Sequence, residues 1–160
     1  MASNIRKRIS KKITKALFDF PMINEGDRVL VGLSGGKDST ALLLSLFSRL
    51  GKFGAPFELA GLHIQSDFGD KAPKNFVKSL EALVNIPIYY LDIAIEGRLK
   101  DGGRLNCYWC STQRRTEFIK FAKENGFNKI ALGHHLDDIL ETLLMNMLYK
   151  GEFSGMPPFV

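Results

Sequence analysis

The sequence predicts a single α/β domain built on a doubly wound parallel sheet with helices on both faces. Short apolar stretches alternate along the chain with longer amphipathic stretches, as strands alternate with the crossover helices that join them. The chain has 160 residues, of which 45% are hydrophobic, and this size fits one globular domain. Ligands of such sheets bind at the carboxyl ends of the strands, so functional residues are expected directly after the strands.

The alternation sets the order of the elements. Strands are predicted at residues 28–33, 59–64, 87–93 and 129–132. Helices are predicted at residues 39–50, 73–84, 111–125 and 137–149. Exposed loops are predicted for the glycine-rich stretch 96–105 and for the stretch 151–158.

A basic segment precedes the first predicted strand. Four apolar residues recur at intervals of four and predict an amphipathic helix that Pro21 ends: Ile5, Ile9, Ile13 and Leu17. Residues 1–18 contain no acid and six basic side chains: Arg6, Lys7, Arg8, Lys11, Lys12 and Lys15. We therefore divide the chain into a basic helix at residues 1–21 and a domain at residues 22–160.

This helix holds all of the excess positive charge of the chain, whose net charge is +5. Lysine and arginine attract the phosphate backbone of nucleic acids, which is the functional interpretation of the segment. A solvated helix that covers the core and a helix that lies on a membrane surface are the alternatives. No apolar run is long enough to span a membrane, and the N-terminus is too charged for a signal peptide. A cytoplasmic protein without a membrane partner is therefore predicted.

The strongest motif lies between the first predicted strand and a predicted helix: Ser34-Gly35-Gly36-Lys37-Asp38-Ser39. Two glycines let the backbone bend around an anion, and the helix N-terminus adds partial positive charge, so the motif predicts a phosphate site. It is not a Walker A loop, which would need glycine in place of Val31 and serine or threonine in place of Asp38. An ordinary glycine-rich turn is the alternative.

A second motif covers residues 132–142, at the end of the fourth predicted strand and the start of the last predicted helix. Asp137 and Asp138 lie four and three residues before Glu141, so carboxylates gather near one end of this helix. Carboxylate oxygens suit a magnesium ion shared with phosphates, which is the predicted role of Asp137 and Asp138. Acidic residues in a first turn also complement the helix dipole without any metal.

The two cysteines of the chain, Cys107 and Cys110, form a CxxC pair before a predicted helix. Their spacing argues against a disulfide framework. Arginines follow, beginning with Arg114, and a helix N-terminus with nearby cations favours reactive or metal-binding thiols. The pair alone is consistent with half of a zinc site, a redox pair, two iron–sulfur ligands, or buried thiols without chemistry.

These motifs resemble those of a known family. Residues 34–39 resemble the PP-loop of the N-type ATP pyrophosphatases, which split ATP between its α and β phosphates. Residues 133–142 resemble the GHHxDDxxET motif of PP-loop enzymes that modify tRNA. The order PP-loop, CxxC, GHHxDD and Met156-Pro157-Pro158 is similar to that of the tRNA 2-thiocytidine synthetases, or TtcA-like proteins. That family replaces a cytidine oxygen in the anticodon loop by sulfur.

The resemblance implies an adenine nucleotide alpha-hydrolase-like fold that binds ATP, Mg2+, a 4Fe-4S iron–sulfur cluster and tRNA. It implies a sulfur donor such as a cysteine desulfurase and allows a homodimer. It assigns catalytic or magnesium-linked roles to Asp38 and Asp137, and sulfur transfer and cluster binding to Cys107 and Cys110. The basic residues of the first helix would contact tRNA.

The resemblance also implies where the nucleotide binds. Phosphate binding is assigned to Ser34, Gly35, Gly36, Lys37, Asp38, Ser39 and Arg114. The remaining nucleotide contacts are expected at the ends of the second and fourth predicted strands, near His63, Ile64, Gly133 and His134. His63 is explained equally well as a structural residue at the end of a strand.

One departure from the family pattern concerns the cluster. The family uses a third cysteine after the MPP motif, and this chain ends at Val160, before that position. We therefore expect a fragment in which two thiolates do not complete a cluster. A lysidine synthetase-like enzyme and a nucleotide-binding module without complete catalysis are the alternative functions.

Overall fold

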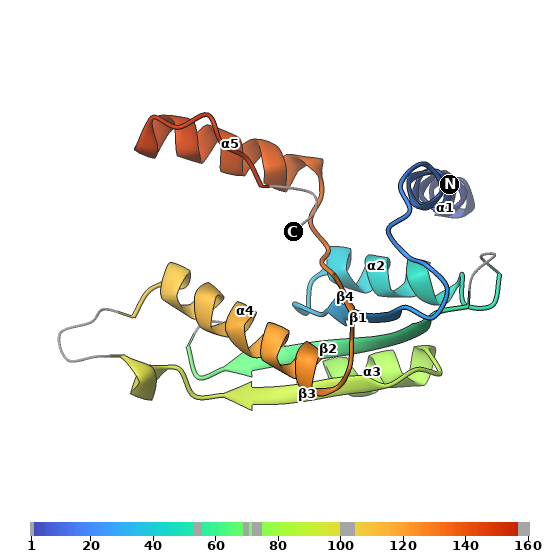
Figure 1. Cartoon of the computed structure of the whole chain (residues 1–160), viewed down its shortest axis with the longest axis horizontal. Helices are drawn as coiled ribbons and strands as arrows, with labels where there is room; N and C mark the ends of the chain where they lie inside the picture. Colours follow the sequence, from blue (N-terminus) through green and yellow to red (C-terminus); the bar gives the residue numbers. More distant parts are fainter. Residues whose placement is uncertain (1, 53–55, 69–70, 72–74, 100–104, 157–160) are drawn as a thin grey trace.

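The computed structural model describes residues 2–52, 56–68, 71, 75–99 and 105–156, with the backbone only for residues 2–6. Its centre is a four-stranded parallel sheet in the order β3-β2-β1-β4 (Figure 1). The strands are β1 (Arg28–Gly32), β2 (Glu58–Ser66), β3 (Ile88–Ile93) and β4 (Lys129–Ala131). The chain adds β2 and β3 on one side of β1 and then returns to add β4 on the other side. This reversal confirms the doubly wound parallel sheet that the sequence predicted.

Helices cover both faces of the sheet. α2 (Lys37–Phe47) and α3 (Phe76–Leu83) lie on one face, and α4 (Cys107–Glu124) lies on the other (Figure 1). Successive residues of β1 point to opposite faces, so Val29 and Val31 join the core cluster of α2 and α3, whereas Leu30 joins that of α4. All three side chains are at most 1% exposed. Burial on both faces explains the unbroken apolar sequence of this strand.

Two further helices lie outside these layers. α1 (Ala2–Asp19) is a helix as predicted, and its Leu17 packs against the cluster of α2 and α3. α5 (Leu136–Lys150) extends away from the sheet after β4 and has no buried residue (Figure 1). Its exposed apolar side chains include Leu136, Leu140, Leu144, Met145 and Leu148. Within the described residues, no helix combines the length and apolar character needed to cross a membrane.

Two helices begin at least two residues earlier than the sequence predicted. α2 begins at Lys37. α4 begins at Cys107, because the Asn106 side chain accepts the N–H of Trp109 at 2.8 Å and caps the helix at that point. The CxxC pair therefore lies inside the first turn of α4 and not before the helix.

The predicted loop at residues 96–105 contains a 3-10 turn, η1 (Glu96–Arg98). The Asp67 carboxylate organises this turn by accepting the N–H of Ile95 at 2.9 Å and that of Glu96 at 3.3 Å. These hydrogen bonds hold the pKa of Asp67 below its usual value. The helix predicted at residues 73–84 begins at Phe76. Residues 73–74 of this predicted helix and residues 100–104 of the predicted loop lie outside the described residues, as does Pro157-Pro158. The domain boundary at residue 21 stays a prediction.

Truncation of Leu43 tests the core between α2 and the sheet. Leu43 is 0% exposed, so Leu43→Ala should lower the free energy of unfolding by about 2–5 kcal/mol. Urea unfolding followed by circular dichroism measures this change. The matched control is Leu148→Ala on α5, where the side chain is 80% exposed and the change should stay within about 0.5 kcal/mol. Equal losses in the two variants would contradict the packing described above.

Candidate functional site

A pocket of about 350 Å³ opens where the carboxyl ends of β1, β2 and β4 meet the loop after β1, one face of α4 and the start of α5. This volume is typical of small-molecule sites, which occupy roughly 300–1,000 Å³. The predicted site residues that line it are Ser34, Gly36, Asp38, Ser39, Ile64, Arg114, Gly133, His134 and Asp138. The pocket therefore lies at the reversal of the sheet, where doubly wound folds bind ligands.

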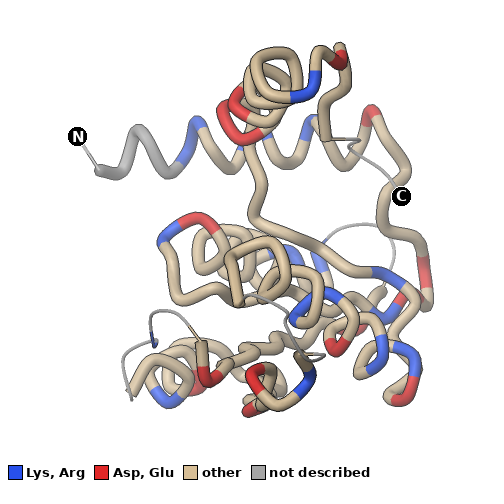
Figure 2. The backbone as a smooth tube through the Cα atoms, turned by 90° about the vertical axis from the view of Figure 1, so that its left-hand side faces the viewer, with Lys and Arg blue, Asp and Glu red and all other residues tan. Residues whose placement is uncertain are grey.

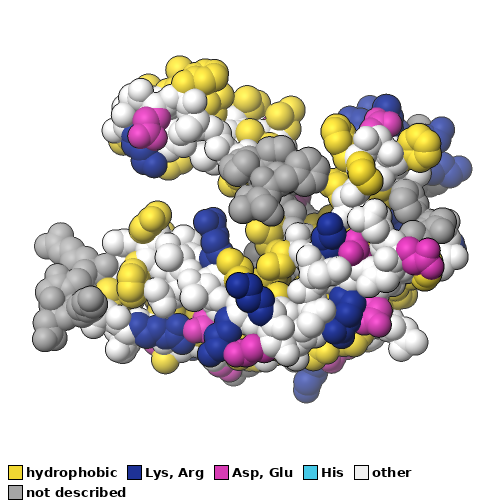
Figure 3. Space-filling model, in the orientation of Figure 1, with side chains coloured by type: hydrophobic (Ala, Val, Ile, Leu, Met, Phe, Trp, Pro, Cys, Tyr) yellow, Lys and Arg dark blue, Asp and Glu magenta, His cyan; other side chains and the backbone are white. Residues whose placement is uncertain are grey.

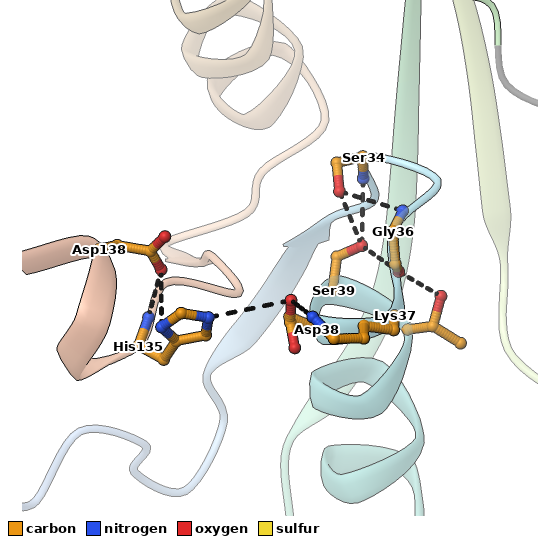
Figure 4. Close-up of polar contacts among 8 residues, drawn as sticks. Ser34, Gly36, Lys37, Asp38, Ser39, His135 and Asp138 are labelled. Atoms are coloured by element: carbon orange, nitrogen blue, oxygen red, sulfur yellow. Dashed lines mark hydrogen bonds and ion pairs between the residues drawn. The ribbon is translucent and has the colours of Figure 1, made fainter. Parts of the chain in front are cut away.

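The loop after β1 is shaped by its own hydroxyl groups (Figure 4). Ser39 Oγ lies 3.1 Å from Ser34 Oγ and accepts the N–H of Ser34 at 3.2 Å. Gly35 has a φ of 86°, a conformation that glycine adopts without strain. α2 then begins with no side-chain cap on its N-terminus. Main-chain N–H groups at this end of the helix can therefore donate hydrogen bonds to an anion.

The two charged residues of this loop pair with each other. Lys37 Nζ lies 2.8 Å from the Asp38 carboxylate, and both side chains are exposed. Their hydrogen bond raises the pKa of Lys37 and lowers the pKa of Asp38. Asp38 lines the pocket, whereas Lys37 and Gly35 are not among the described lining residues. An anion bound at the start of α2 would compete with Asp38 for the Lys37 ammonium.

The end of β4 approaches the start of α2 at Gly133. A Cβ atom at this position would lie 2.8 Å from the Ser39 main-chain nitrogen and 2.9 Å from its Cα. Both neighbours are backbone atoms, which cannot move aside as a side chain would, so the contact admits only glycine. This approach brings the two motifs to opposite sides of one pocket.

His135 is a site residue that the sequence analysis missed. Its Nδ1 lies 3.3 Å from the Asp138 carboxylate, and its Nε2 lies 4.0 Å from the Asp38 carboxylate (Figure 4). The imidazole thus stands between the loop after β1 and the start of α5. The sequence offers two adjacent histidines, and the pattern alone does not tell which of them faces the loop. His134, which the sequence analysis expected near the nucleotide, also lines the pocket.

The acidic residues at the start of α5 have different positions. Asp138 caps the helix by accepting the His135 N–H at 2.7 Å in a capping box, which is the metal-free role considered for these acids. Asp137 is not among the described residues that line the pocket. Within the described residues, no group of three or more His, Cys, Asp and Glu side chains could hold a metal ion. The magnesium assignment stays a prediction.

Neighbouring residues near the end of β2 point to opposite faces of the sheet. Ile64 packs in the cluster of α4 and lines the pocket. The ring of His63 instead lies 5.6 Å from that of Phe76 in α3, and its Nδ1 donates to the Leu33 carbonyl at 2.7 Å. The structure brings Ile64 to the pocket and keeps His63, which is 4% exposed, on the other side of the sheet.

The cysteine pair occupies the first turn of α4. Cys107 is exposed, whereas Cys110 is 3% exposed and its Sγ lies 3.5 Å from Ser66 Oγ at the end of β2. Arg114 and Phe118 follow at intervals of four residues, so they lie on the same side of α4 as Cys110. Both line the pocket. One helix face therefore carries the buried thiol and part of the pocket lining.

The basic residues predicted to contact nucleic acid lie along α1 (Figure 2). Lys7, Arg8, Lys11, Lys12 and Lys15 are exposed, and the side chain of Arg6 lies outside the described residues. Lys15 Nζ pairs with Asp19 at 2.6 Å. The nucleic-acid assignment of these residues stays a prediction.

Comparison with known proteins identifies the family. A model of the PP-loop domain matches residues 1–157. The chain belongs to the PP-loop family. A tRNA-cytidine(32) 2-sulfurtransferase from Stenotrophomonas maltophilia is 37% identical to this PP-loop protein over 160 residues, covering 96% of the chain and 51% of the relative. The enzyme of that name from Vibrio cholerae is 39% identical over 159 residues, covering 98% and 51%. The resemblance to 2-thiocytidine synthetases is confirmed, and the chain spans about half the length of these relatives.

Solved structures share the fold of this PP-loop protein. The U34-tRNA thiolase NcsA from Methanococcus maripaludis, solved with its [4Fe-4S] cluster, has a TM-score of 0.71 at 19% identity, covering 92% of this chain and 50% of that one. NMN synthetase from Francisella tularensis has a TM-score of 0.53 at 25% identity, covering 78% and 52%. Both support the doubly wound α/β architecture.

Gly133→Ala tests the contact between β4 and α2. The added Cβ would force the end of β4 away from Ser39 and widen the pocket, so ATP affinity should fall by about tenfold or more, a change of ~1.4 kcal/mol. Isothermal titration calorimetry measures the affinity. The matched control is Gly97→Ala, where a Cβ would meet no atom within 4 Å and ATP affinity should not change. Unchanged affinity in Gly133→Ala would show that the contact does not shape the site.

Proposed function

We propose that this PP-loop protein belongs to an ATP-dependent tRNA thiolation enzyme that acts on cytidine 32. The arrangement of α4 carries the proposal. Cys110 lies one helical turn before Arg114, and Arg114 lines the pocket at the switch point of the sheet. Sulfur transfer to an activated base needs a sulfur carrier near the nucleotide, and a cysteine can serve as a persulfide or as a cluster ligand. The names of relatives at 37% and 39% identity support the same reaction and the same tRNA position.

The first step is adenylation of the base. The cytidine C2 oxygen attacks the α phosphorus of ATP, an O–P bond forms, and the bond to the bridging oxygen breaks so that pyrophosphate leaves. Residues 34–39 would hold the leaving pyrophosphate through main-chain N–H groups and Lys37, and Arg114 would offset phosphate charge. Ile64, Gly133 and His134 line the same pocket and would contact the rest of the nucleotide.

The second step replaces oxygen by sulfur. A sulfur atom at the oxidation level of hydrosulfide attacks C2, the C2–O bond breaks, AMP leaves with the oxygen, and loss of the sulfur-bound proton gives the 2-thiocytidine. Cys107 is exposed and would receive sulfur as a persulfide from an external donor such as a cysteine desulfurase. The Cys110 thiolate would then attack the inner sulfur of that persulfide, so that a Cys107–Cys110 disulfide forms and the outer sulfur leaves as hydrosulfide. An external thiol would reduce this disulfide before the next turnover. Cys110 belongs to the same buried cluster as Ile64, which lines the pocket, and this shared packing supports a role for its thiol close to the nucleotide.

Different residues of this chain would hold a magnesium ion and an iron–sulfur cluster. Asp38 and Asp138 lie on either side of His135, and their oxygens would suit a magnesium ion shared with the phosphates. Cys107 and Cys110 would give an iron–sulfur cluster two thiolates. The described residues hold no group of three potential ligands, so a cluster needs a ligand from outside them. Neither step above depends on the cluster.

The role of Asp137, a homodimer and a cytoplasmic location also remain proposals.

A lysidine synthetase-like reaction is the second candidate, because it also begins with adenylation of a cytidine. It needs no cysteine, however. The burial of Cys110 on the helix face that carries Arg114 favours thiolation. A nucleotide-binding module without catalysis is the third candidate, and product analysis separates it from both enzymes.

Product analysis tests the nucleotide chemistry. With tRNA present, ATP turnover should give AMP and pyrophosphate, measured by chromatography, and release of ADP would contradict the assignment. Asp38→Asn should lower turnover by about tenfold or more, equivalent to ~1.4 kcal/mol of transition-state stabilisation. The same variant should bind pyrophosphate in EDTA at least as tightly as the wild type, because no carboxylate competes for Lys37. Asp137→Asn, measured beside it, tests whether the acid outside the pocket lining contributes.

Cysteine variants test the sulfur step. Cys107→Ser and Cys110→Ser should each abolish tRNA thiolation, measured by nucleoside mass spectrometry, while ATP affinity stays unchanged. Iodoacetamide should modify Cys107 before Cys110, because only Cys107 is exposed. Ser111→Ala, in the same turn of α4, is the matched control and should keep both activities. Thiolation by the double cysteine variant would exclude this mechanism and favour the second or third candidate.

A further inference from the structure

Arg49 is a buried arginine that ties α1 to the end of α2. It is 6% exposed. Its guanidinium donates to the Ser45 carbonyl at 2.5 Å in the last turn of α2, and it also donates to the Ser10 carbonyl at 2.6 Å and to Thr14 Oγ1 at 3.0 Å in α1. Within the described residues, no carboxylate lies at ion-pair distance from it. A cation at the C-terminal end of α2 is stabilised there by the helix dipole and by these oxygens.

These contacts determine which side of α1 faces the protein. Ser10, Thr14 and Leu17 recur at intervals of four and three residues, and together they meet Arg49 and the core. Each residue of an α-helix is rotated by about 100° from the one before it. Ser10, Thr14 and Leu17 form the contact face of α1. A second row of side chains begins one residue later, at Lys11, and therefore lies beside this contact face. It continues through Lys15 and Phe18.

This second row of side chains, together with Ser10 and Thr14, lines a hollow that combines basic, hydroxyl and aromatic side chains. The hollow measures about 360 Å³ and is lined by Ser10, Lys11, Thr14, Lys15 and Phe18. Phe18 is 83% exposed. Two lysines, Ser10 and Thr14 thus share this hollow with a phenylalanine, and Figure 3 shows dark blue and yellow side chains together over α1. Lys15 also pairs with Asp19 at 2.6 Å, but both side chains are exposed and a phosphate can displace that weak pairing.

We infer that this hollow binds one nucleotide of a single-stranded RNA segment, with its phosphate at Lys11 and Lys15 and its base stacked on Phe18. The inference rests on the proposed function, since it specifies how α1 would contact tRNA. Positive charge beside an exposed aromatic ring is the combination that binds unpaired nucleotides. Lys12 points about 100° further from the contact face and has no aromatic neighbour in this row of side chains, so it lies outside the hollow.

α2 separates Arg49 from the phosphate loop. It has 11 residues and therefore spans roughly 16 Å, with the phosphate loop at its start and Arg49 just beyond its end. Arg49 is thus a positioning residue, because it orients α1 relative to the helix that carries the phosphate loop.

Fluorescence anisotropy titrations of the full chain with a tRNA transcript, at several salt concentrations, test the inference. Phe18→Ala should weaken binding by roughly 5- to 150-fold without changing the salt dependence, and Phe18→Trp should restore affinity. Lys11→Gln should reduce the salt slope by about 0.7, and this reduction should exceed that of the matched variant Lys12→Gln, whose side chain lies outside the hollow. Thr14→Val and Arg49→Met should each make the Phe18→Ala effect smaller, because α1 is no longer held in one orientation.

Circular dichroism of each variant checks that α1 and the domain remain folded. If Arg49→Met does not fold, Thr14→Val alone tests whether the orientation of α1 matters. Equal effects of Lys11→Gln and Lys12→Gln, or tRNA binding that is insensitive to Phe18, would overturn the inference while leaving the thiolation proposal intact. Absence of tRNA binding at any salt would overturn both. Binding of phosphatidylserine vesicles in place of tRNA, lost in Phe18→Ala, would replace the RNA site by a membrane-surface helix.

Discussion

The approach of β4 to the first turn of α2 is the constraint on which the candidate site depends. Gly133 meets the backbone of Ser39 without room for a Cβ atom, so main chain packs directly against main chain. This contact fixes the distance between the end of β4 and the start of α2, and hence the width of the pocket between them. It also brings His135 and Asp138 within reach of Asp38. The polar contacts in the site follow from this packing.

Local sequence was sufficient to predict much of this arrangement. The four strands, the phosphate loop and the glycine after β4 are each encoded within a few consecutive residues. Two further local signals were not used in the prediction. Alternation along β2 separates His63 from Ile64, and Asn106 is a strong helix cap that moves the start of α4 to Cys107.

Other features could not be predicted, because they depend on packing between distant segments. Arg49 is one of several arginines in the sequence, and its burial depends on oxygens of α1 that only the folded chain brings near. The role of His135 depends similarly on where Asp38 lies after folding. The shared cluster of Ile64 and Cys110 depends on which face of the sheet α4 covers. That cluster makes the floor of the nucleotide pocket and the seat of the buried thiol a single packed unit.

α5 has a thermodynamic consequence for the site it helps to form. It has 15 residues and none is buried, so its stability in the described part of the chain comes from local terms such as its capping box. Helices of that length without tertiary packing are only marginally stable in water. Asp138 is in position only while the first turn of α5 is formed. The fraction of time that this turn is helical therefore multiplies the intrinsic affinity of any ligand that binds through Asp138.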